Sequence, residues 1–162
     1  MHVLIIPSEV FVTGLNPVGS IFQYEQAKAL VKAGHQVGVI SVGFITLRYL
    51  FQKYPFCAKE NQGLLKIRRK YRRSILLERY VWPEFNVQRY LKLFKKQYHE
   101  YFCEFGHPDI VHSHDFFYAG SMAAWLKDTY GIPFVLTVHS SSFARGSIPH
   151  RYDDLLKKIG SK

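Results

Sequence analysis

Two polar segments, each directly after a short apolar run, hold the side chains that could take part in chemistry. The first reads His112-Ser113-His114-Asp115, and the second runs from residue 137 to 142 and includes His139 and Ser140. Alternation along a strand puts His112 and His114 on one side, with Asp115 at the end. Together these groups offer the hydrogen-bond donors and acceptors that a ligand rich in hydroxyls requires. If the two runs end side by side, they predict a site of that kind.

The histidines also admit other interpretations. A single histidine at a strand end often bonds to the backbone, and His112, still inside its predicted strand, fits that description. Two histidines at strand spacing and a carboxylate can bind zinc, so a metal-dependent hydrolase is an alternative that would use a cluster of four residues: His112, His114, Asp115 and His139. The arrival of His114 and His139 at two strand ends together favours a ligand-binding role.

A loop with several turn-forming residues precedes the first predicted helix. Gly14 and Gly19 lie in this loop, where the free N–H groups and the dipole of the helix favour an anion. The complete G-x-G-x-x-G pattern is absent. The loop therefore predicts either a phosphate site or only a turn.

Strand-like and helix-like segments alternate along the chain. Strands are expected at 3–6, 37–42, 64–68, 109–112 and 133–138, and helices at 18–33, 86–105, 118–130 and 152–159, with an aromatic, potentially helical segment at 44–56. Ser20 and Gln23 have the spacing of a capping box, and Gly34 follows the first helix. A strand, helix and strand in this order predict parallel pairing. We expect one α/β domain over residues 1–162, doubly wound around a mainly parallel, Rossmann-like sheet whose ligands bind beyond the carboxyl ends of the strands.

Composition limits the class of protein. The 162 residues are 48% hydrophobic, enough for one sizeable core, and hold no apolar run long enough to cross a bilayer. The start has no signal-peptide pattern, and Cys57 and Cys103 are too sparse for a disulfide framework. A cytoplasmic location is the expectation.

Much of the net charge of +10 comes from one segment, KIRRKYRR at 66–73. Its six cations are Lys66, Arg68, Arg69, Lys70, Arg72 and Arg73. Such a cluster is typical of a solvated loop or of contact with an anionic membrane, where each cation contributes about 1 kcal/mol. A phosphorylated acceptor is a further candidate. Nucleic acid is not expected, because no base-reading motif accompanies the charge.

Two blocks resemble the N-terminal domain of retaining glycosyltransferases of the GT-B fold, in glycosyltransferase family four. They are VLIIP at 3–7 with NPVGSIFQYEQAKALVKAGHQVGVISV at 16–42, and PDIVHSHDFFYAGSMAAWLKDTYGIPFVLTVHSSSF at 108–143. The first is similar to the glycine loop, helix and GH-x-V segment of the family. The second is similar to its PD-x-x-H-x-H and T-x-H strands. The first loop departs from the family, because Val18 stands where a second glycine is often found.

The resemblance implies roles for particular residues. His139 of the T-x-H motif would bond to the donor sugar, and the N–H groups of Gly19 and Ser20 would reach the donor phosphates. The acceptor pocket would include the following residues: His114, Asp115, Ser140 and Arg145.

The resemblance also implies the reaction and its participants. A sugar would pass from a nucleotide-sugar donor to a glycan or lipid-linked acceptor with retention, without a metal or other cofactor. Membrane contact through the basic segment would make the enzyme peripheral to the inner face of the cell membrane. The second domain, which holds most of the nucleotide sugar in this family, is absent from these 162 residues. We therefore expect this domain alone to be inactive, and a non-catalytic sugar- or nucleotide-binding module remains a further alternative.

Overall fold

The computed structural model describes residues 1–7, 10–11, 19–46, 57–74, 83–139, 145–146, 148 and 150–161. The strands are β1 (His2–Ile6), β2 (Gln36–Thr46), β3 (Cys57–Gln62), β4 (Leu65–Ser74), β5 (Ile110–His114) and β6 (Phe134–Thr137). The helices are α1 (Ile21–Lys32), α2 (Pro83–Phe105), α3 (Tyr118–Tyr130), η3 (His150–Tyr152) and α4 (Asp153–Gly160).

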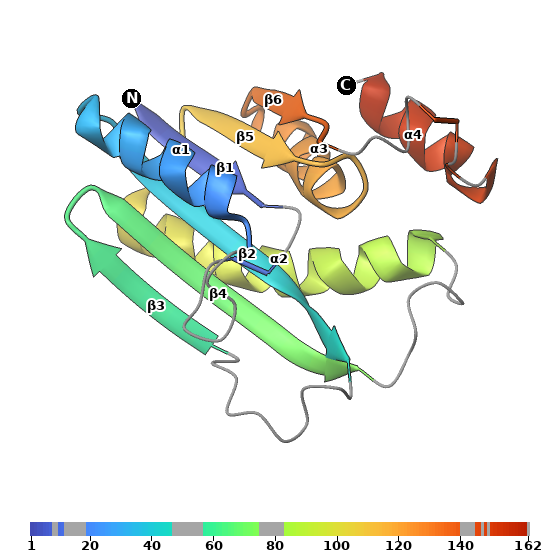
Figure 1. The fold of residues 1–162 in the computed structure, drawn as a ribbon, viewed down its shortest axis with the longest axis horizontal. Coiled ribbons are helices and arrows are strands. Elements are labelled where there is room, and N and C mark those ends of the chain that lie inside the picture. The colour runs from blue at the N-terminus through green and yellow to red at the C-terminus, as the bar shows by residue number, and fades with distance from the viewer. Residues whose placement is uncertain are drawn as a thin grey trace.

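The strands form one sheet in the order β3-β4-β2-β1-β5-β6 (Figure 1). All neighbouring pairs are parallel except β3 and β4, which form an antiparallel hairpin at one edge. The apolar runs of β1 and β5 occupy the interior, as expected for strands covered on both faces. The predicted doubly wound, mainly parallel α/β architecture is confirmed.

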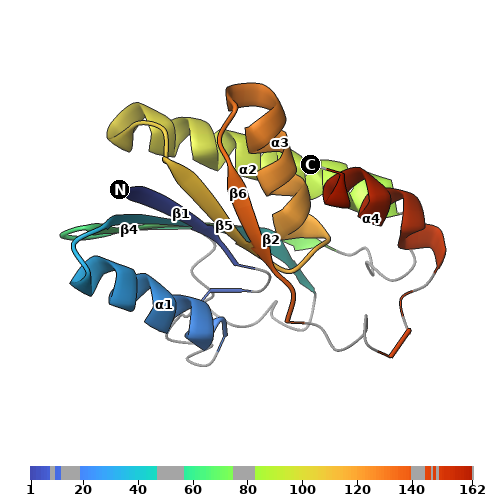
Figure 2. The same ribbon diagram turned by 90° about the horizontal axis from the view of Figure 1, so that it is seen from above.

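Helices cover both faces of this sheet. Figure 2 shows α1 on one face and α2 and α3 on the other, and α4 packs against α2 and α3. Beneath α1, a core cluster includes Val3, Val39 and Ile67. On the other face, Phe94 and Tyr98 of α2 belong to a cluster with side chains of β1, β2, β5 and α3. The aromatic stripe of the long predicted helix is therefore core.

The structure corrects two predictions about local elements and adds a strand that the sequence did not predict. Residues 44–46 continue β2 rather than start a helix, while residues 47–56 lie outside the described part. β3 was not predicted, because its sequence CAKENQ is polar and largely exposed. Ser20 precedes α1 in a left-handed conformation (φ 54°) and makes no side-chain capping bond, so the predicted capping box does not form. Gly34 follows α1 with φ 84°, where glycine is favoured.

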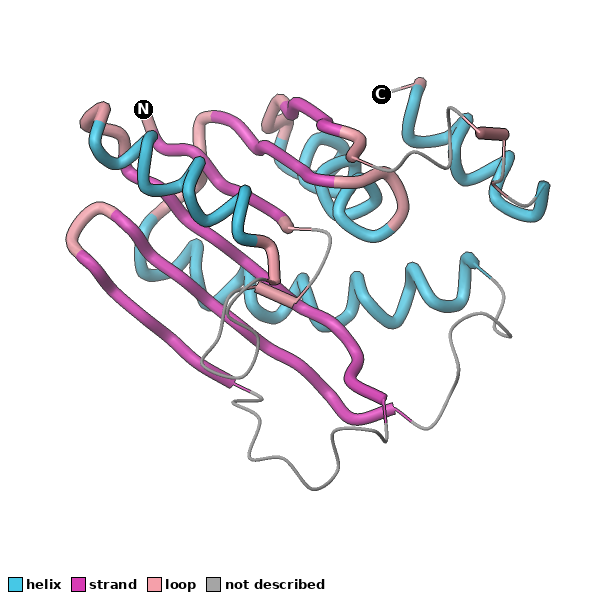
Figure 3. Tube along the Cα trace, in the orientation of Figure 1, coloured by secondary structure: helices cyan, strands magenta, loops and turns pink. Residues whose placement is uncertain are grey.

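The basic segment is an inner strand of the sheet rather than a loop. β4 extends through the whole of KIRRKYRR and pairs with β2 and β3, as the adjacent long magenta strands of Figure 3 show. Arg69 is 7% exposed and forms an ion pair with Glu60 of β3. Arg68 is 1% exposed, on the α2 side. The expectation of one exposed patch of six cations is corrected for Arg68 and Arg69.

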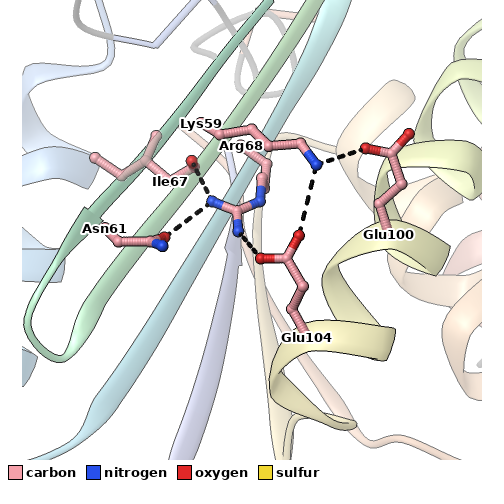
Figure 4. A network of polar contacts seen from close by, with 6 residues as sticks. All are labelled: Lys59, Asn61, Ile67, Arg68, Glu100 and Glu104. Carbon is pink, nitrogen blue, oxygen red and sulfur yellow. Dashed lines mark hydrogen bonds and ion pairs between the residues drawn. The ribbon is translucent and has the colours of Figure 1, made fainter.

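A polar network accounts for the burial of Arg68 (Figure 4). Its guanidinium donates to Glu104 Oε2 at 2.6 Å, to Asn61 Oδ1 at 3.1 Å and to the carbonyl of Ile67 at 3.2 Å. Lys59 of β3 lies 3.1 Å from Glu100 and 3.5 Å from Glu104, both on α2. Burial alone would raise the pKa of Glu104, but Arg68 and Lys59 outweigh this effect and lower it.

Close contact between α2 and β2 depends on a glycine. The Tyr101 ring lies directly on Gly38, where an added Cβ would stand 2.5 Å from the ring carbon Cζ. The Tyr101 hydroxyl is then 2.6 Å from Nε2 of His2 on β1. Gly38 thus permits the tyrosine to link α2 to two strands.

We predict that Gly38→Ala destabilises the fold, because the methyl group would overlap a fully buried ring. The expected loss in free energy of unfolding is about 2 kcal/mol, measured by urea denaturation. Gly43→Ala on the same strand is the control, since its Cβ would meet Tyr71 at an ordinary 3.6 Å. Equal effects of the two substitutions would contradict this account.

Candidate functional site

The carboxyl ends of β5 and β6 lie side by side and bring the two predicted polar segments together. His114 pairs with Thr137 in the parallel register, and the Asp115 N–H donates to the Thr137 carbonyl at 2.8 Å. His112 and His114 share the sheet face that α1 covers, since Gln26 of α1 contacts His112. The predicted meeting of residues 114–115 with His139 is confirmed, whereas residues 140–144 lie outside the described part.

Three histidine rings stand in a row near the carboxyl ends of β5 and β6. The rings of His112 and His114 are 4.2 Å apart, and those of His114 and His139 are 5.2 Å apart and nearly parallel. His114 Nδ1 and His139 Nε2 are 2.9 Å apart, so one donates a hydrogen bond to the other. His114 is 3% exposed whereas His139 is exposed, which makes His139 the member of the pair that faces outward.

His112 is fixed from both sides by side chains. The Gln26 amide lies 3.2 Å from its Nδ1, and Thr137 Oγ1 lies 2.7 Å from its Nε2. An amide N–H that donates to Nδ1 leaves the hydrogen on Nε2, which then donates to Thr137. The expected backbone bond of His112 is thus replaced by two side-chain bonds.

Burial favours the uncharged forms of His112 and His114 in this row. Burial, with smaller contributions from His112 and His139, lowers the pKa of His114 to about 4. Burial, and then His139, lowers the pKa of His112 as well. At neutral pH His114 is therefore a neutral imidazole, and its bond to His139 requires one ring to donate and the other to accept. Its Nε2 is buried with no hydrogen-bond partner among the described residues.

Asp115 shapes the turn that leads into α3. It has a left-handed backbone (φ 75°), and its Oδ1 accepts from the Phe116 N–H at 2.7 Å. Its carbonyl accepts from the Gly120 N–H at 3.1 Å. A non-glycine residue in this conformation costs about 1 kcal/mol or more, and such strain is common at functional sites. The predicted acceptor residue has a structural role that the sequence did not reveal.

The other predicted site residues occupy different places. Gly19 and Ser20 are buried at the start of α1, on the same face of the sheet as the histidines. Arg145 is exposed in a turn with Gly146. Ser140 lies outside the described residues, and so does the side chain of Arg73.

Two residues that sequence analysis did not select support the site, namely Gln26 and Thr137. Thr137 belongs to the T-x-H motif, so the motif itself held the signal. Gln26 had no such signal, because its role depends on the packing of α1 over β5.

The geometry does not favour the hydrolase alternative. The bonds to Gln26 and Thr137 occupy both ring nitrogens of His112, so this histidine has no nitrogen left for a zinc ion. Within the described ranges, no group of three or more His, Cys, Asp or Glu residues is arranged to hold a metal ion.

Comparison with known families is decisive for the class of protein. The sequence model of Glycosyltransferase Family 4 matches residues 20–161. The chain belongs to this family. The match includes both strand ends that hold the histidines and the whole of α1. A search of curated proteins gave no match.

A comparison of structures agrees with this family on the fold. Sucrose-phosphate synthase from Thermosynechococcus elongatus is similar with a TM-score of 0.60 at 13% identity. The alignment covers 99% of this chain and 40% of that one. The expected resemblance to the N-terminal domain of a GT-B glycosyltransferase is confirmed at the level of family and fold. Among the described residues, no helix is long and apolar enough to cross a membrane.

The lowered pKa of His114 predicts a stability that depends on pH. Its pKa rises from about 4 in the folded chain to 6.5 on unfolding, so between these values the unfolded chain binds more protons. Stability should therefore fall as pH drops through this window, by about 2 kcal/mol between pH 7 and pH 5.

Urea denaturation at both pH values measures the effect. His114→Gln should reduce the difference, while His99→Gln, at an exposed position on α2, should keep it. An unchanged difference in His114→Gln would show that other groups cause the pH dependence.

Proposed function

We propose that this chain is the acceptor-side half of a glycosyltransferase that moves a sugar from a nucleotide-sugar donor to a glycan or lipid-linked acceptor, with retention at the anomeric carbon. Membership of glycosyltransferase family 4 supports the class of reaction. The observation that carries the proposal is the His114–His139 pair, which presents an exposed, oriented imidazole at the joined ends of two parallel strands.

In this proposal His139 binds a hydroxyl of the donor sugar. Its Nε2 is engaged by His114, so its Nδ1 remains to donate to, or accept from, the ligand, according to the tautomer. The row behind it, from His114 to His112 and Thr137, holds the ring in one orientation. A ring held in one orientation suits a sugar hydroxyl, because little reorganisation is required when the ligand binds.

The start of α1 would contribute to leaving-group stabilisation. Gly19 and Ser20 place backbone N–H groups at the positive end of the helix dipole, on the same face of the sheet as the histidines. Fixed dipoles of this kind stabilise the charge that develops on a departing phosphate. We assign no metal and no catalytic base to this domain.

A second domain would hold most of the nucleotide sugar. The chain spans 40% of the length of the structural relative, which leaves room for such a partner. We further propose a cytoplasmic enzyme that acts at the inner face of a membrane.

His139→Ala in the enzyme that joins both domains tests the assignment. Loss of one oriented hydrogen bond to the reacting sugar should lower kcat/KM by about 10²-fold or more, as measured by release of the nucleotide product. His35→Ala is the control, since His35 lies at the opposite, amino-terminal edge of the sheet. Full activity of His139→Ala would exclude this role for the imidazole.

We also predict that the 162-residue chain alone will not transfer sugar. The proposed donor contacts at α1 and His139 are too few to hold a nucleotide sugar in place. Incubation of the isolated chain with a panel of nucleotide sugars should release no nucleotide above the uncatalysed rate. Measured turnover would show that these residues form a complete active site.

A further inference from the structure

A groove of about 340 Å³ lies between the carboxyl-terminal part of β4 and the middle of α2. It is on the face of the sheet opposite the histidine row. Five cations line it, and they are Lys70 and Arg72 of β4 with Arg89, Lys92 and Lys96 of α2. The three from α2 are spaced by three and four residues, which places them on one side of the helix.

The two ends of the β4–α2 interface differ in their charge balance. Where α2 ends, Arg68 and Lys59 meet Glu104 and Glu100. At the groove, none of the described lining residues is acidic. Lys70, Arg72, Lys92 and Lys96 make no ion pair with a carboxylate of the described residues. The groove therefore gathers like charges that repel one another until an anion enters.

Two further features indicate a preformed binding site rather than a surface that is only charged. The Arg89 guanidinium is held 3.9 Å from the centre of the Phe44 ring and donates to Asn86 Oδ1 at 3.0 Å. Gln97, which also lines the groove, is 2% exposed, and its Oε1 has no hydrogen-bond partner among the described residues. A rotated Gln97 amide would offer two N–H donors at the same wall.

We propose that this groove binds the phosphate group of a phosphate ester. Arginine and lysine at a concave wall, with no acidic residue among the described lining, match the three acceptor oxygens of a phosphate. A carboxylate would leave most of these donors unused.

The position of the groove connects this site to the transferase, an interpretation that rests on the proposed function. Phe44 contacts Tyr90, whose ring stacks at 4.0 Å on Tyr118, the first residue of α3. Tyr118 follows the Asp115 turn directly. An acceptor whose phosphate occupies the groove would thus lie along a row of aromatic rings that leads to the strand ends.

Pyrophosphate binding to the 162-residue chain, measured by isothermal titration calorimetry, tests the site. Lys92→Glu/Lys96→Glu should weaken binding by about tenfold or more, because two charge-assisted bonds become repulsive. Lys32→Glu/Lys95→Glu is the matched control: it changes net charge equally, also at exposed lysines, one of them adjacent to Lys96 on α2. Thermal unfolding of both variants verifies that they remain folded.

Saturable binding that is lost only in the groove variant would support the site. Equal weakening in both double variants would show that binding follows net charge alone and would overturn the proposal, as would a lack of saturable binding to the original chain. The readout uses no sugar donor, so a failed titration leaves the transferase proposal intact, and an inactive transferase leaves this site intact.

Sedimentation with vesicles distinguishes the two sources of the phosphate. Binding to phosphatidic acid–phosphatidylcholine vesicles that the groove variant loses and the control variant keeps would assign a lipid-linked phosphate. Pyrophosphate binding without vesicle binding would assign a soluble phosphate ester. Both results support the same chemistry at the groove.

Discussion

The buried guanidinium of Arg68 is a constraint that the position of α2 must satisfy. A charge removed from water costs several kcal/mol, and an opposite charge together with hydrogen bonds offsets that cost. Glu104 near the end of α2 supplies the partner, and Asn61 of β3 supplies a further acceptor. The helix is thereby fixed against β4 at one end, and Lys59 forms a second ion pair with the same carboxylate.

Once that end of α2 is fixed, the rest of the helix packs along the sheet. Tyr101 reaches across Gly38 to His2, and Phe94 and Tyr98 bury their rings against the sheet. The middle of the helix then runs past the carboxyl end of β4, where no acidic residue in the described lining of the groove pairs with the cations. The same packing that neutralises one end of the interface concentrates positive charge at the other.

Sequence patterns predicted the parts of the molecule that follow a simple period. The apolar runs predicted the inner parallel strands, and the polar residues after two of them predicted that His114 and His139 meet. Only the start of the basic strand was predicted, at residues 64–68, because charged side chains occupy both faces of the rest of β4. Its buried apolar side chains are Leu65, Ile67 and Tyr71. Glu104, the ion-pair partner of the buried Arg68, lies 36 residues away from it in the chain. The left-handed backbone of Ser20 has no local signal either.

The histidines and the cationic groove lie on opposite faces of the sheet. On the face that α1 covers, burial favours neutral His112 and His114, which suits contact with hydroxyl groups. On the α2 face the cations gather in a groove that requires an anion. The net charge of β4 does not show which of its cations can meet a ligand, because two of the six are buried within the sheet. The strand alternation that sends each side chain to one face decides which partner it can meet.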